Sequence, residues 1–221
     1  MSGGSKSSSG VTRPWRGISA GDRRAERRHR LLDAGLELFG TRGVAATGIG
    51  DICEQAGLTK RYFYESFASI DQLAEAVFEQ ITDRIAERVI PGIVAGGGSD
   101  PRPALTAWVE AVVGDPRVVR ILAVEGRSGR LARSGAGFAN RAVDLWFAFA
   151  GEDTQRRDDP APRLRAYAFA GAMAQIGLAW HDRQLPMTAD AMIDELVALF
   201  YRVSDTKPPQ RGQRERQSRQ T

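Results

Sequence analysis

Residues 43–73 (GVAATGIGDICEQAGLTKRYFYESFASIDQL) hold two short helical patterns joined by a tight turn. No other feature constrains the fold as strongly. The chain has to reverse at Ala56-Gly57, and glycine adopts the positive φ of such turns at the least steric cost. Thr47 is expected to cap the first of these helices and Thr59 the second. The pattern predicts a helix-turn-helix.

The apolar residues of this segment are expected to pack against a preceding helix that begins near Asp22 and ends at Gly43. They are Ile49, Ile52, Leu58, Phe63 and Phe67, and their expected partners are Leu32, Leu36 and Phe39. The exposed set on the second helix of the motif is then Thr59, Lys60, Arg61, Tyr62, Tyr64 and Glu65. Hydroxyls, cations and aromatic rings at a helix N-terminus suit phosphates and base edges in a major groove. The alternative is that Tyr62 and Tyr64 only cover the rim of a small core.

Charge is distributed unevenly along the chain, although the formal net charge is only +4. Residues 1–30 carry eight basic and two acidic side chains, a net charge of +6, whereas residues 31–203 have a net charge of −5. A basic N-terminal segment on an acidic body is typical of a protein that neutralises DNA phosphates. A tail that only improves solubility would show the same charge, so the charge alone leaves both interpretations open.

The first helix and the motif together resemble the DNA-binding domain of the TetR (tetracycline-repressor) family. The resemblance rests on the run RRHRLLDAGLELFGTRG, on Thr47, and on the pattern D-I-C-E-Q-A-G-L-T-K-x-x-F-Y-x-x-F-x-x-x-x-x-L. It covers about the first 70 residues, a third of the chain. It implies phosphate contacts for Thr47 and Tyr64, and positions facing the groove for Lys60, Arg61 and Tyr62. By the same resemblance, Arg23, Arg24, Arg27 and Arg28 would contact phosphates or the minor groove.

Four positions depart from the family pattern. Ser66 stands where histidine or tyrosine is common, Ile70 replaces a frequent lysine, and Glu65 adds a negative charge near the expected DNA surface. Arg61 takes a position usually occupied by glycine, and we expect it to recognise guanine. The arginine-rich N-terminal segment is expected to compensate for the contacts that are lost.

Beyond the motif every periodic segment is helical, and no run alternates with period two for long enough to indicate a sheet. The fold class is therefore predicted as all-α, with an N-terminal three-helix domain and a larger helical ligand-binding and dimerisation domain. A long helix is expected from residue 71 to a stop at Pro91, followed by a loop over 92–102. Further helices are expected over 103–114, 117–125, 131–150, 163–180 and 188–203. The predicted divisions are a disordered arm (1–20), the DNA-binding domain (21–70), the effector-binding and dimerisation domain (71–203) and a disordered tail (204–221).

Two stripes in the last helices predict a dimer. Small residues recur at i+4 spacing at Ala166, Ala170 and Ala174, and the final helix has an apolar stripe of Ile193, Leu196, Val197 and Phe200. Two such helices from each subunit would form a two-fold four-helix interface. The alternative is that both stripes pack inside one monomer.

Aromatic and polar residues in the middle of the body are candidates for the wall of a ligand pocket. They are Trp108, Arg120, Glu125, Trp146, Phe149, Tyr167, Met173 and Trp180. Such a wall would suit an unidentified small and largely apolar effector, although aromatic residues at helical spacing can equally be ordinary core. Ligand binding is expected to shift helix 71–90 and so change the separation of the two DNA-binding domains.

Other classes of function lack support in the sequence. A single cysteine, Cys53, leaves no intramolecular disulfide, and two histidines make a metal cluster improbable. The sequence shows no catalytic motif, no phosphate-binding glycine loop, no signal-peptide h-region and no apolar run of the ~20 residues that a membrane span needs. We expect a cytoplasmic homodimer without cofactor or enzymatic activity, a repressor that binds palindromic double-stranded operator DNA and is released by its effector. The alternatives are an effector-independent activator and an architectural DNA binder.

Overall fold

The computed structural model describes residues 19–97, 99–127, 131–150, 155, 158–204 and 206. Within these ranges all regular structure is helical, which confirms the all-α prediction. The helices are α1 (Ala20–Thr41), α2 (Ile49–Ala56), α3 (Lys60–Ser66), α4 (Ile70–Gly96), α5 (Arg102–Trp108), α6 (Pro116–Ala123), α7 (Ala132–Phe149), α8 (Pro160–His181) and α9 (Ala189–Val203). A π-helix over Val109–Val113 continues α5, and a 3-10 helix over Glu125–Arg127 follows α6.

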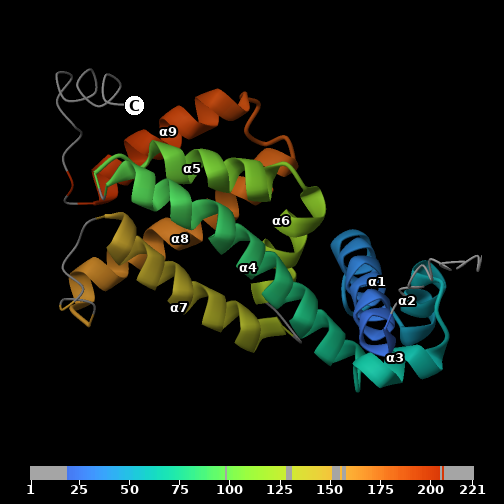
Figure 1. Ribbon diagram of the computed structural model, residues 1–221. Coiled ribbons are helices and arrows are strands. Elements are labelled where there is room, and N and C mark those ends of the chain that lie inside the picture. The colour runs from blue at the N-terminus through green and yellow to red at the C-terminus, as the bar shows by residue number, and fades with distance from the viewer. Residues whose placement is uncertain are drawn as a thin grey trace, which may run out of the picture.

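The chain forms two lobes, a head of α1–α3 and a body of α5–α9, and the long helix α4 runs from one into the other (Figure 1). Helix α1 packs against α2, α3 and α4. Its fully buried face carries Leu31, Ala34, Leu38 and Phe39, while Leu32 and Leu36 are only partly buried. Phe39 is therefore buried as predicted, but Leu31 takes the buried position that was predicted for Leu32, because adjacent leucines fit either register of the helix.

Helix α4 continues through Pro91 to Gly96, so the predicted stop at Pro91 was wrong, and so was the start of the predicted loop at residue 92. Proline removes one backbone hydrogen bond from a helix interior. Packing on α5 favours the continued helix, because Gly92 lies so close to α5 that a Cβ there would be 2.7 Å from the Ala104 Cα. Tertiary contact, not local propensity, decides where a helix of this kind ends.

Both stripes predicted for the dimer lie largely inside the body of a single chain. Ala166 on α8 and all four apolar residues of α9, namely Ile193, Leu196, Val197 and Phe200, are buried there, and Ala170 and Ala174 are half-buried. Phe200 contacts the rings of Trp146, Phe149 and Phe169 at centroid distances of 4.6–5.9 Å. These buried residues therefore form intramolecular core, whereas a dimer contact through the half-buried Ala170 and Ala174 stays a prediction.

The predicted disordered segments fall almost entirely outside the described residues. Where they overlap with them, Ser19 caps α1 through a reciprocal pair of bonds with Asp22, and Ser204 is the C-cap of α9. Helix α1 thus begins two residues before the predicted position. None of the described helices is both long and apolar enough to cross a membrane.

Candidate DNA-binding surface and ligand cavity

The turn between α2 and α3 has the geometry that its sequence predicted. Gly57 caps α2 in the left-handed region at φ +61°, and its N–H bonds back to the Glu54 carbonyl. Arg30, from α1, donates to the carbonyls of Ala56 and Gly57 and so holds the turn from outside. Sequence reasoning missed this role, because α1 and the turn are far apart along the chain.

Helix α3 presents the side chains that we call the recognition surface, Thr59, Lys60, Arg61, Tyr62 and Tyr64, all of them exposed. Tyr64 is 59% exposed and Tyr62 36%, whereas Phe63 and Phe67 between and beyond them are buried. Thr59 stands at the N-cap position, but its side chain forms no capping hydrogen bond. The hydroxyl is therefore available to another acceptor or donor.

Thr47 is only 6% exposed, and its hydroxyl donates to the Gly43 carbonyl at 2.8 Å. The N-cap of α2 is Gly48, so the prediction that Thr47 caps this helix was wrong. A phosphate contact through Thr47 stays a prediction.

Three arginines of α1 hold the C-terminal end of α3. Arg24 donates to the Glu65 carbonyl at 2.8 Å, and Arg28 donates to the Ser66 carbonyl and stacks over Phe67. Arg27 stacks over Tyr62 and lies 3.7 Å from the Glu65 carboxylate. Cations at the C-terminal end of a helix interact favourably with the negative pole of the helix dipole. These residues lie beside the recognition surface, but their present partners belong to the head itself.

The negative charge of Glu65 is paired within the head. Its carboxylate accepts from Arg61 Nε at 3.2 Å and lies beside Arg27.

Cys53 lies on the buried side of α2, where burial raises the pKa of its thiol. A raised pKa disfavours the reactive thiolate, which fits a small hydrophobic core residue.

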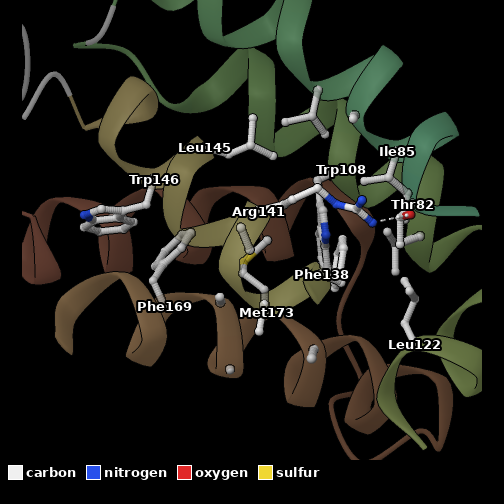
Figure 2. A pocket seen from close by; sticks show the side chains of 18 of the residues that line it. Thr82, Ile85, Trp108, Leu122, Phe138, Arg141, Leu145, Trp146, Phe169 and Met173 are labelled. Carbon is white, nitrogen blue, oxygen red and sulfur yellow. Dashed lines mark hydrogen bonds between the residues drawn. The ribbon is translucent and has the colours of Figure 1, made fainter. Parts of the chain in front are cut away.

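A cavity of about 630 Å³ lies in the body between α4, α5, α7 and α8. Five of the eight predicted pocket residues line it: Trp108, Trp146, Phe149, Tyr167 and Met173. The other wall residues are mostly apolar side chains of α4 and α7, and Figure 2 shows Ile85, Phe138 and Leu145 among them. The cavity volume lies within the range of small-molecule sites.

Three predicted pocket residues lie elsewhere. The Trp180 indole donates to the Met187 carbonyl at 2.9 Å, outside the cavity wall. Arg120 and Glu125 lie beside Gly43, where a Cβ would come within 2.8 Å of the Glu125 Oε1. They thus belong to the contact between head and body. Their polarity suggested a ligand site, but sequence cannot distinguish polar groups facing a ligand from those facing another lobe.

The contact between head and body centres on Arg117 of α6. Its guanidinium donates to Glu37 of α1 at 2.7 Å and forms two bonds with Asp115, at 2.7 and 2.9 Å. Gly40 of α1 faces the Arg117 backbone, and a Cβ there would lie 2.8 Å from the Arg117 Cα. The Arg117 side-chain hydrogen bond lowers the pKa of Asp115, and its two carboxylate partners raise the pKa of Arg117.

This contact makes stability depend on pH. Folding lowers the pKa of Asp115, so its ionised carboxylate adds to the free energy of unfolding. This stabilisation is complete above the pKa of the unfolded state, about 3.9, and is lost as the pH falls through the pKa of the folded state. We expect the wild type to lose more unfolding free energy than Asp115→Asn between pH 7 and pH 3. The difference should be under about 1 kcal/mol, since the pair is partly solvated. Urea unfolding at both pH values measures it. Asparagine still caps α6, so equal losses in the two proteins would contradict the prediction.

Comparison with known proteins places this geometry in context. Residues 31–77 match the family model described as bacterial regulatory proteins, tetR family. The transcriptional activator FasR of Mycolicibacterium smegmatis is 36% identical over 104 residues, which cover 46% of this chain and 47% of that protein. The match thus spans about half the length of this curated relative.

Solved structures of TetR-like regulators share the fold of both lobes. A TetR-like regulator from Rhodococcus sp. RHA1 matches with a TM-score of 0.63 and 22% identity, covering 80% of this chain and 94% of that one. FadR from Bacillus subtilis in complex with stearoyl-CoA matches with a TM-score of 0.62 and 16% identity, covering 78% and 96%. At these identities the likeness extends to the fold alone.

Proposed function

From the match of residues 31–77 to the tetR family model, we propose that this chain belongs to the TetR family and regulates transcription by binding operator DNA as a homodimer under control of a small ligand. The observation that carries the proposal is the exposed recognition surface on α3, presented by a turn that Gly57 and Arg30 hold. A helix presented in this way fits the major groove, with its cations and hydroxyls available to base edges and phosphates. Such a regulator acts in the cytoplasm.

Repression relieved by ligand is the proposed mode. The second candidate is activation, which is favoured by the name of FasR, a transcriptional activator. NalD of Pseudomonas aeruginosa, another structural neighbour, is a repressor of a multidrug efflux pump, so the proteins similar to this chain include both an activator and a repressor. The sign of regulation depends on where the operator lies relative to the promoter.

The ligand is proposed to occupy the cavity of the body. Its wall is mainly apolar, and the neighbour FadR carries stearoyl-CoA, a ligand with a long apolar chain. Two helices connect the cavity to the head. Helix α4 lines the cavity and enters the head. Helix α6 carries the cavity residues Val119 and Leu122 and also Arg117, which contacts the head. A ligand changes operator affinity only if it binds better to one head orientation.

The dimer is proposed to use the outward side of α8, in place of the buried stripes. Leu164 is 69% exposed there, and the same side carries Ala168 and Gln175, both exposed. Small side chains allow a helix of a second subunit to approach closely. Two heads would then meet half-sites about one helical turn (~34–36 Å) apart.

Selection of bound duplexes from a random pool, followed by footprinting, tests the DNA-binding proposal. We expect a palindromic site that the protein prefers strongly over random DNA at physiological salt. Binding without sequence preference would indicate an architectural protein and overturn the proposal.

On the selected site, Arg61→Ala is expected to cost roughly 1–3 kcal/mol and to relax preference at one base pair. Arg61 is an exposed member of the recognition surface, and arginine pairs well with guanine. Fluorescence anisotropy on cognate and single-mismatch duplexes measures both effects. The exposed Arg88 of α4, outside the head, provides the matched control Arg88→Ala. An equal loss on all duplexes would assign Arg61 to the phosphate backbone instead.

A further inference from the structure

We propose that the ligand of the cavity is an amphipathic molecule with one extended apolar chain and one anionic end group, and that Arg141 binds this end. The inference rests on the proposed function and deepens it by stating the chemical class of the effector. It starts from the distribution of polarity along the cavity wall.

The α4 wall of the cavity is long and mainly apolar. It extends from Phe78 to Ile93, which corresponds to ~22 Å of helix axis. A wall of this length accommodates a single extended chain.

One guanidinium crosses this apolar space. Arg141 extends from α7 to α4, where its Nη2 donates to the Thr82 hydroxyl at 3.1 Å (Figure 2). Thr82 is buried and donates in turn to the Glu79 carbonyl at 2.9 Å. This chain of bonds holds the cation at the cavity wall. A guanidinium has five N–H donors, of which the bond to Thr82 uses one.

The wall away from the guanidinium is aromatic. Trp146 and Phe169 lie there with their ring centroids 5.0 Å apart, and Met173 lies between them and the guanidinium (Figure 2). An apolar chain directed toward these rings would place its polar end at Arg141. Burial of the hydrocarbon chain drives affinity, and the guanidinium selects the end group.

Other charged residues also line the cavity. They are Asp83, Arg127 and Asp144, all exposed, so the two cations and two carboxylates of the wall balance. Arg141 is exposed as well, but it differs from the other three in its hydrogen bond to the buried Thr82, which holds its guanidinium at the cavity wall. A cationic amphiphile bound by the carboxylates is the alternative outcome of the test.

The test compares three probes of equal chain length, tetradecanoate, tetradecan-1-ol and tetradecylamine, binding to the full chain. Trp108 and Trp146 line the cavity, so quenching of tryptophan fluorescence reports binding. We expect the acid to bind about ten- to a hundredfold more tightly than the alcohol, as a charge-assisted hydrogen bond allows. The amine should bind most weakly.

Variants assign the effect to one residue. Arg141→Met keeps an apolar stem of similar length and should remove the advantage of the acid while leaving the affinity for the alcohol unchanged. Thr82→Val should reduce the advantage in part, because Arg141 loses its fixed position. Arg84→Met, on an exposed position of α4 outside the cavity wall, is the matched control and should change nothing. Thermal unfolding of each variant checks that the fold persists.

The possible failures are distinguishable. Equal binding of acid and alcohol, preference for the amine, or an acid advantage that disappears in Arg127→Met rather than Arg141→Met would overturn the inference alone. The operator selection needs no ligand, so it would still support DNA recognition in those cases. If none of the three probes bound, the cavity would lose its proposed role for this ligand class, and the inference would fail with it.

Discussion

Phe63→Ala is expected to destabilise the head by about 3–5 kcal/mol and so to abolish operator binding. Phe63 has no exposed surface, and it packs in the core shared by α1, α2 and α3. Its ring lies 6.0 Å from Phe67 and 5.6 Å from Tyr64. Helices α2 and α3 are short, so the cavity left by alanine has few neighbours that could collapse into it. A loss of this size is a large fraction of the 5–15 kcal/mol that stabilises an ordinary domain.

Tyr64→Ala is the matched control for this prediction. Tyr64 follows Phe63 directly but points outward, so its removal should change the unfolding free energy by less than about 1 kcal/mol and still weaken operator binding. Urea unfolding and anisotropy titrations on the selected operator distinguish the two effects. If Phe63→Ala and Tyr64→Ala lowered stability equally, the division of α3 into a buried and a DNA-facing side would be wrong.

Gly40→Ala is expected to destabilise the protein by about 1–3 kcal/mol and to suppress the response of operator affinity to ligand. In an exposed helix the same change would stabilise by up to about 1 kcal/mol. Here the added Cβ would lie 2.3 Å from the Arg117 Cβ and 2.8 Å from its Cα. Rotation of a side chain cannot relieve a clash with a backbone atom, so α1 and α6 have to separate.

Separating α1 from α6 affects operator binding because the two helices belong to different lobes. Moving them apart weakens the bond between Arg117 and Glu37 and reorients the head on the body. Gly137→Ala is the control, since a Cβ there meets nothing within 4 Å. Operator affinity is measured with and without tetradecanoate in each protein. A full ligand response in Gly40→Ala would show that α4 alone carries the signal.

The features of the head that the sequence predicted are determined by residues that lie close together along the chain. The turn at Gly57, the inward direction of Phe63 and Phe67, and the outward direction of Tyr62 and Tyr64 all follow from helical periodicity and turn chemistry. The DNA contacts expected of the α1 arginines stay a prediction. Their contacts with the C-terminal end of α3 were not foreseen, because they join residues about forty positions apart.

In the body the sequence predicted the helices but not what their faces contact. The α9 stripe ending at Phe200 has the pattern of a dimer interface and is intramolecular core, while Arg120 has the polarity of a pocket residue and lies at the contact between the lobes. Arg141 gave no signal, since one arginine on an apolar helix is usually solvated. The structure brings it to Thr82, 59 residues earlier in the chain.

By itself, then, the sequence determined an all-helical chain with a helix-turn-helix and the outward-facing recognition surface of Thr59, Lys60, Arg61, Tyr62 and Tyr64. These properties depend on backbone conformation and on spacings of three and four residues, which each segment carries alone. Only the tertiary structure decided where α4 ends, which stripe becomes core, and which side chains line the cavity. An apolar stripe loses water equally well against its own chain, a partner or a ligand, so its burial free energy does not specify what covers it.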